Sequence, residues 1–282
     1  MWAAPRGATI APVSNQEQLD QELEAIYDAL DRGDARAALD RTVQVLAQED
    51  DPVLRLLAGV ALLELERPAE AERHLRRAVE MDGEDAEARI KLASSLHALC
   101  RIDEAREQAE KGLEIEASLA EGHDVMAMIL ELGGEIAEAD FHLTRAAELD
   151  PEMFPAPQRM SGEEFEQVVR EAGEALPETF RRHLDDVALS VEPVPPRTLL
   201  EAENPPLDPR LLGLFVGHAL DERSSMSPGG ELPARIYLFQ RNLERFATNR
   251  DERREQIAIT VYHELGHYLG LDEDELEQIN LA

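Results

Sequence analysis

The chain has 282 residues, of which 60 are acidic and 28 basic, so its formal net charge at pH 7 is −32. This charge repels phosphate backbones and anionic lipids, which argues against nucleic acid or a membrane surface as a partner. A single cysteine, Cys100, excludes a disulfide framework and a thiolate metal cluster. The sequence shows neither a membrane-length apolar run nor a signal-peptide pattern, so we expect a cytoplasmic protein.

Residues 1–15 are expected to form a flexible tail, and the sequence repeats over residues 16–153. Three blocks, 52–85, 86–119 and 120–153, contain 34 residues each, and a weaker copy precedes them at about 18–51. Small residues recur in every block at three positions where two helices would cross. They are Gly59, Ala93 and Ala127, then Ala71, Ala105 and Ala139, then Ala78, Gly112 and Ala146.

This pattern resembles the tetratricopeptide repeat, whose units are helix pairs of this length. The resemblance implies an all-α solenoid in which each pair buries its apolar face by stacking on its neighbours. It also implies a concave surface that binds a protein or peptide partner. The early Trp of the family is missing, while Pro151 stands where the family pattern closes its last unit. We interpret the scattered histidines of this region as ordinary helix residues without ligand spacing: His74, His97, His123 and His142.

Three prolines between residues 151 and 157 mark a boundary, so we place a linker at 154–160 and a second domain at 161–282. Ser161 and Glu164 form a capping box, which predicts a helix to about residue 176, followed by a short helix at about 177–184. Alternating apolar and polar residues then predict strands. The strand segments are 186–192, 212–216 and 234–239, with loops at 193–210 and 219–233 and a short helix at about 242–247.

Residues 251–269 are predicted to form one long helix, which Asp251 can cap. Apolar residues at three- and four-residue spacing form its core face. Gly270 can end the helix in a left-handed conformation, and a last helix is expected at 273–281. The residues of the core face are Ile257, Val261, Leu265 and Tyr268.

Within this helix, His263, Glu264 and His267 form the motif His-Glu-x-x-His. Residues four apart share one helix face, about 5–6 Å from each other, so both imidazoles can bind one Zn²⁺. Glu264 follows the first ligand, where it can deprotonate a metal-bound water without binding the metal itself. An amphipathic helix with two surface histidines is the alternative, and a glycine three residues after the second histidine makes it a rare coincidence.

A catalytic zinc site normally has three protein ligands. Three acidic residues follow the helix, Asp272, Glu273 and Asp274. On a continuous helix, Asp274 would lie roughly 10 Å beyond His267 along the axis, so the chain must first bend, and Gly270 is best suited to do so. Any of the three acids could then bind the metal, although Asp272 or Asp274 could instead cap the last helix.

The C-terminal half resembles the small bacterial minimal zincin metallopeptidases, over about residues 158–282 and most densely over 234–277. The similarity lies in the order of elements and in the segments 211–217 and 221–224. It also includes the family motif His-Glu-x-x-His-x-x-Gly-x-x-Asp up to its glycine, Gly270. It implies an α+β zincin fold whose catalytic helix packs on the sheet. A metzincin would also need a methionine turn downstream, but the last methionine is Met226.

The resemblance also implies the ligands. His263, His267 and the residue ten positions after His263 would hold the zinc, and that residue is Glu273, where the family has Asp. Asp272 remains an alternative because Glu is longer than the Asp it replaces, and Asp274 is the third choice. Glu264 would be the general base.

We therefore expect two domains, an all-α tetratricopeptide-repeat solenoid followed by a small α+β zincin-like domain. The expected function is zinc-dependent peptide hydrolysis, with a repeat domain that binds a protein or peptide. An alternative is a zinc-binding scaffold with little or no activity that acts through its repeats. The substrate is expected to align as an added strand along 212–216 or 234–239. Tyr262 and Tyr268 could assist an oxyanion, although packing is the commoner role of such residues.

Overall fold

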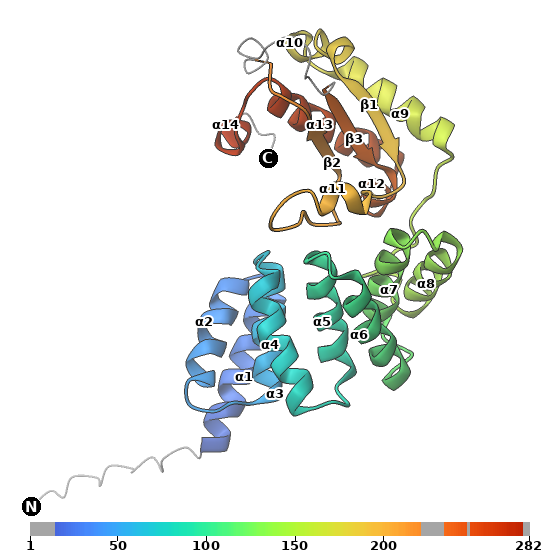
Figure 1. Cartoon of the computed structure of the whole chain (residues 1–282). Coiled ribbons are helices and arrows are strands. Elements are labelled where there is room, and N and C mark those ends of the chain that lie inside the picture. Colours follow the sequence, from blue (N-terminus) through green and yellow to red (C-terminus); the bar gives the residue numbers. More distant parts are fainter. Residues whose placement is uncertain (1–14, 221–233, 247–248, 279–282) are drawn as a thin grey trace, which may run out of the picture. The chain divides into compact units, whose positions relative to one another are not determined.

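The computed structural model describes residues 15–220, 234–246 and 249–278, drawn in colour in Figure 1. The chain forms two compact units. One contains the residues up to 96 together with 107–116, and the other contains 97–106 together with the residues from 117 onward. The predicted tail at 1–15 lies outside the described residues except for Asn15, which begins the first helix.

Eight helices in antiparallel succession form the repeat region, as predicted. Aspartates and prolines set several of their starts: Asp51 accepts hydrogen bonds from the N–H groups of Val53 and Leu54, and Pro52 occupies the first turn. The helices are α1 (Asn15–Asp31), α2 (Ala35–Leu46), α3 (Pro52–Glu64), α4 (Pro68–Met81), α5 (Ala86–Ala98), α6 (Ile102–Ile115), α7 (Ala120–Leu132) and α8 (Ile136–Leu149).

The recurring small residues lie where the two helices of a pair approach most closely. A Cβ atom on Gly59 would come within 2.4 Å of the Leu75 side chain, and one on Gly112 within 2.7 Å of Ile90. The alanines at these positions are at most 1% exposed. The predicted repeat of 34 residues therefore has a packing cause, because a larger side chain would push the paired helices apart. Those alanines are Ala71, Ala78, Ala93, Ala105, Ala127, Ala139 and Ala146.

Polar side chains also recur with the repeat, in pairs 19 residues apart that join the two helices of one unit. His123 and His142, which look unrelated in the sequence, form one of these pairs, with their Nδ1 atoms 2.9 Å apart. Periodicity could have indicated this, because each pair follows the previous one by 34 residues. The equivalent pairs are Arg55 with His74 at 3.4 Å and Arg89 with Gln108 at 3.0 Å.

The second unit contains a three-stranded sheet in the order β1-β3-β2, in which β3 runs parallel to β1 and antiparallel to β2. All three predicted strands are found within two residues of their expected bounds, but one turn of helix, α11, lies inside the expected proline-rich loop. The strands are β1 (Ala188–Glu192), β2 (Gly213–Val216) and β3 (Arg235–Phe239). The other elements are α9 (Gly162–Ala175), α10 (Glu178–Arg181), η1 (Leu184–Asp186), α11 (Arg197–Leu200), α12 (Gln240–Phe246), α13 (Arg250–Tyr268) and α14 (Glu273–Gln278).

The core of this unit lies between the sheet and the helices α13 and α9 (Figure 1). The predicted capping box of Ser161 and Glu164 starts α9. Ile236 and Leu238 of β3 point into the core, as strand alternation requires. The predicted apolar face of α13 meets them, and all four of its residues are fully buried: Ile257, Val261, Leu265 and Tyr268.

Helix α7 is joined to the rest of the second unit by a buried ionic cluster. Glu131 of α7 is 2% exposed and accepts hydrogen bonds from Arg159, Arg241 and Arg245, at 3.1, 2.7 and 2.9 Å. Two of these arginines are one turn apart on α12. The last helix pair of the repeat region therefore lies in one compact unit with the sheet. The domain boundary at 154–160 remains a prediction.

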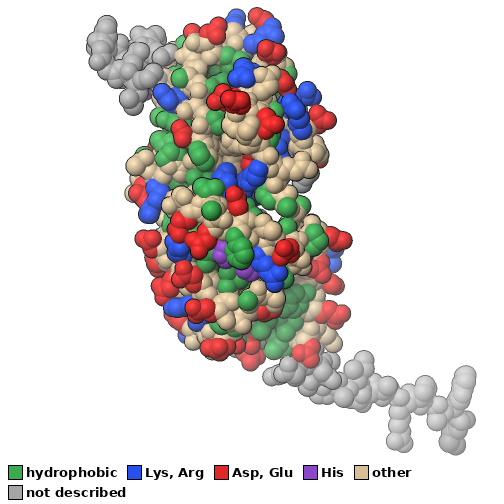
Figure 2. All heavy atoms as spheres, turned by 90° about the vertical axis from the view of Figure 1, so that its right-hand side faces the viewer, with side chains coloured by type: hydrophobic (Ala, Val, Ile, Leu, Met, Phe, Trp, Pro, Cys, Tyr) green, Lys and Arg blue, Asp and Glu red, His purple; other side chains and the backbone are tan. Residues whose placement is uncertain are grey.

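The surface carries many acidic side chains with basic ones among them (Figure 2). Several ion pairs of the described repeats join residues three or four apart on one helix, such as Arg76 with Glu72 on α4. Such exposed pairs contribute little to stability. None of the described helices combines the length and the apolar character needed to cross a membrane.

Candidate metal centre

Helix α13 carries the motif predicted to bind the metal, and the helix starts at a different cap from the one predicted. The cap is Asn249 and not Asp251: the Asn249 side-chain oxygen accepts hydrogen bonds from the N–H groups of Asp251 and Glu252, at 3.1 and 3.0 Å. Asp251 and Glu252 therefore lie in the first turn, where their charges favour the positive end of the helix dipole.

The end of α13 reverses the chain. Gly270 has φ +90°, and the N–H groups of Gly270 and Leu271 donate to the carbonyls of His267 and Gly266, both at 3.0 Å. These two bonds form the Schellman motif that closes a helix at a left-handed residue. Gly266 then makes room for α14, because a Cβ atom there would lie 2.4 Å from Leu276. The reversal therefore brings α14 back against the last turn of α13.

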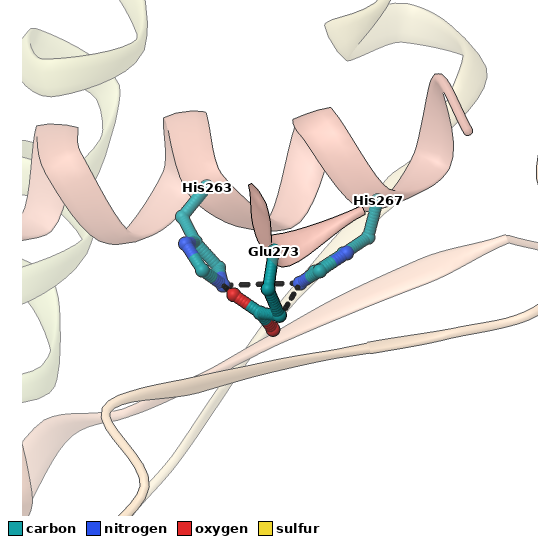
Figure 3. A group of neighbouring side chains, drawn as sticks. All are labelled: His263, His267 and Glu273. Atoms are coloured by element: carbon teal, nitrogen blue, oxygen red, sulfur yellow. Dashed lines mark hydrogen bonds and ion pairs between the residues drawn. The ribbon is translucent and has the colours of Figure 1, made fainter. Parts of the chain in front are cut away.

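This reversal brings Glu273 to the two histidines (Figure 3). The Nε2 atoms of His263 and His267 lie 3.0 Å apart. A Glu273 oxygen lies 3.3 Å from His267 Nε2, and the other lies 3.9 Å from His263 Nε2. One donor atom from each residue falls within a sphere of metal-binding size, with all three within 4.8 Å of one another.

The chemistry of this donor set fits Zn²⁺. A tetrahedral ion with ligands at about 2.0–2.2 Å separates its ligand atoms by roughly 3.3 Å, close to the distances between these three side chains. The Nδ1 atom of His267 donates to the carbonyl of Leu271 at 3.2 Å, which leaves the Nε2 lone pair facing the other two donors. A cation would also neutralise the charge of Glu273. The helix-ending turn thus both delivers the third side chain and orients the second imidazole.

The other two acids lie elsewhere. Asp272 caps α14: its carboxylate accepts from the N–H of Glu275 at 2.9 Å, and Glu275 accepts from the N–H of Asp272 at 3.1 Å. Asp274 is exposed and does not belong to the group of donors. The choice of Glu273 as third ligand stays a prediction, and the geometry of the described residues is the reason to keep it.

Glu264 follows His263 on α13 and interacts electrostatically with all three donor residues. It is 8% exposed, and its carboxylate accepts a hydrogen bond of 2.7 Å from the N–H of Phe215 on β2. Burial raises the pKa of Glu264 above its ordinary value of 4.5, against the lowering effects of His263 and of the Phe215 N–H. Gly213 permits this approach, because a Cβ atom there would lie 2.6 Å from Thr260 and 3.3 Å from Glu264.

A cleft follows the edge strand β2. It has a volume of about 780 Å³ and lies between Leu214–Gly217 and the loop at 199–208. Because β3 pairs on both of its sides, the expectation that 234–239 could align a substrate is wrong. Tyr268 is fully buried in the core. Tyr262 packs edge-on against Phe180, with the ring centres 4.0 Å apart.

Comparison with known proteins agrees with this architecture. A model of the zincin-like metallopeptidase family matches residues 184–282, and a tetratricopeptide-repeat model matches residues 62–129. The chain therefore contains a zincin-like metallopeptidase domain preceded by tetratricopeptide repeats. No curated protein matches it.

Several solved structures are similar to the repeat region. One is YrrB, described as a TPR protein with an unusual peptide-binding site, at 24% identity over 48% of this chain and 73% of that chain, with a TM-score of 0.40. Another is a thermophilic TPR protein of Thermus thermophilus, at 16% identity over 58% and 94% of the two chains, with a TM-score of 0.44. MamA is similar at 17% identity over 50% and 77%, with a TM-score of 0.39.

Proposed function

We propose that this protein is a zinc-dependent peptidase whose repeats bind a protein or peptide. The observation that carries this proposal is the convergence of His263, His267 and Glu273 within 4.8 Å of one another, directly beside the buried Glu264. Two neutral imidazoles and one carboxylate are a common ligand set of catalytic zinc in hydrolases. The zincin-like family supports the same conclusion.

His263, His267 and Glu273 would hold Zn²⁺. The ion would act as a Lewis acid and lower the pKa of a bound water to ~7. Glu264 would take the proton of the attacking water and deliver it to the leaving amine. The Phe215 N–H would hold one carboxylate oxygen in place, so that the other oxygen handles the proton.

The edge strand β2 would align the substrate as an added strand. The alternation of the antiparallel ladder directs the Phe215 N–H away from β3, in agreement with its bond to Glu264. An extended peptide in the cleft beside Leu214–Gly217 would therefore pass next to the catalytic carboxylate. The repeats would select the partner or substrate, since stacked helix pairs create extended binding surfaces.

Metal analysis and peptide digestion test this function. Wild-type protein is expected to bind about one zinc ion per chain, and His263→Ala with His267→Ala to bind none. His123→Ala is a matched control, because that histidine is hydrogen-bonded within the repeats and should leave the zinc content unchanged. Stoichiometric zinc in the double variant would show that the metal lies elsewhere.

The variant Glu264→Gln tests whether the protein is a peptidase or a zinc-binding scaffold. It should keep the zinc and lose digestion of a peptide library, because Gln cannot accept a proton from water. Equal digestion by the wild-type protein and by Glu264→Gln would show that Glu264 is not the general base. Zinc binding without digestion by the wild-type protein would instead favour a zinc-binding scaffold that acts through its repeats.

A further inference from the structure

A cavity of about 280 Å³ lies in the second unit, away from the metal centre. Its walls come from the end of α5, from α7 and α12, and from the segments after β1 and before β2. Most of the lining is apolar. The apolar residues are Met128, Leu132, Val194, Pro209, Leu212 and Phe246.

One of the uncharged polar side chains in the lining is His97. His97 is 3% exposed, and no described residue is seen to bond to its ring. Burial lowers the pKa of His97 to about 4, so the ring is neutral at pH 7 and can donate one hydrogen bond and accept another. Because His97 lines the cavity, its ring can form a hydrogen bond with a ligand that enters.

The charged groups around the cavity already have partners. Arg245 donates to Asp124 at 2.5 Å and to Glu131 at 2.9 Å, and Arg210 donates to Asp208 at 2.6 Å. A charged ligand would have to compete with these pairs or lose its hydration without compensation. The cavity therefore favours an uncharged ligand.

The wall formed by the loop before β2 is held in place by hydrogen bonds. The side-chain amide of Asn242 donates to the carbonyls of Pro209 and Leu211, at 2.9 and 2.7 Å. These bonds attach the loop before β2 to α12. A preformed apolar wall with few polar groups is typical of sites for small molecules.

We propose that this cavity binds an uncharged aromatic ligand of about the size of indole, whose single polar group forms a hydrogen bond with His97. The size follows from volume: a cavity of about 150 Å³ holds benzene, and this one is nearly twice as large. The ligand is either a free compound or the side chain of a tryptophan in a bound peptide, since both offer the same ring and N–H group. The site does not depend on the proposed peptidase activity.

Calorimetric titration with indole and with benzothiophene tests the proposal, because benzothiophene has nearly the same shape but lacks the N–H. Wild-type protein is expected to bind indole saturably, at one site per chain, and about tenfold more tightly than benzothiophene. His97→Leu should remove that difference by weakening indole alone. His74→Leu, which alters a half-buried histidine of α4 outside the cavity, is the matched control and should bind as wild type does.

Met128→Trp fills the cavity and should abolish binding of both compounds. Circular dichroism verifies that this variant is folded, and if it is not, the comparison between wild type and His97→Leu decides. N-acetyl-tryptophanamide distinguishes the two sources of the ligand: its binding supports a peptide side chain, and binding of indole alone supports a free compound. Unchanged indole affinity in His97→Leu, equal binding of both ring compounds by wild type, or no saturable binding of indole would overturn the proposal.

Discussion

Replacing Glu131 by Gln tests whether the ionic cluster holds the second unit together. Glu131 is 2% exposed, and three arginines donate to it within 3.1 Å. Removing one partner from a buried ion pair costs about 3–5 kcal/mol. Each arginine keeps a second acidic partner, and their side chains are 11–27% exposed, so part of this cost is recovered. We therefore expect a loss of roughly 2–3 kcal/mol in the free energy of unfolding.

Equilibrium urea unfolding of the full chain, followed by circular dichroism, measures this loss, and hydrogen exchange of the α12 amides locates it. Glu135→Gln is the matched control: this residue starts α8 and binds Arg106, but its side chain is 38% exposed, so a smaller loss is expected. Equal losses of unfolding free energy in the two variants would show that the ionic cluster does not stabilise the second unit. A loss below about 0.5 kcal/mol in Glu131→Gln would show the same.

The stability difference between wild type and Glu131→Gln is expected to depend on pH. Burial alone would raise the pKa of Glu131, but Arg245 and Arg241 hold it below its ordinary value of 4.5. A carboxyl group with a lowered pKa in the folded state stabilises the fold above its unfolded-state pKa. That contribution is lost as pH falls through the folded-state pKa. The difference between wild type and Glu131→Gln should therefore be constant near neutral pH and shrink below pH 4.5.

Three further predictions concern the metal centre and the boundary. Of three single alanine variants, Glu273→Ala should weaken zinc binding most in a competition assay with a chelator; a larger effect of Asp272→Ala or Asp274→Ala would move the third ligand to that residue. Gly213→Ala should reduce peptide hydrolysis more than zinc content, because the new Cβ would push β2 away from α13; full activity would show that the strand can shift freely. A fragment beginning at Ser161 lacks α7 and α8 and should unfold at lower urea concentration than one that keeps them. Equal midpoints would support the predicted boundary.

The sequence by itself determined the features that depend on local pattern. The repeat period follows from small residues that must recur wherever two helices cross, and the core faces follow from helical spacing. The capping box at Ser161 and the left-handed Gly270 depend on interactions within a few residues, so their positions were predictable. The three strands were found for the same reason. The cap of α13 was assigned to Asp251 instead of Asn249, because both residue types can cap and only two positions separate them.

Only the tertiary structure decided which distant residues meet. Glu131 and Arg241 are 110 residues apart in sequence, and no local pattern indicates that they form a pair. The bond from Phe215 to Glu264 joins residues 49 positions apart, and its donor is a backbone group that every residue type but proline possesses. Strand order places β2 at an edge and β3 at the centre of the described sheet, and packing forms the cavity at His97. A single sequence records side-chain chemistry along the chain but not the contacts between distant segments, and those contacts determine whether a charged or polar side chain is solvated or buried.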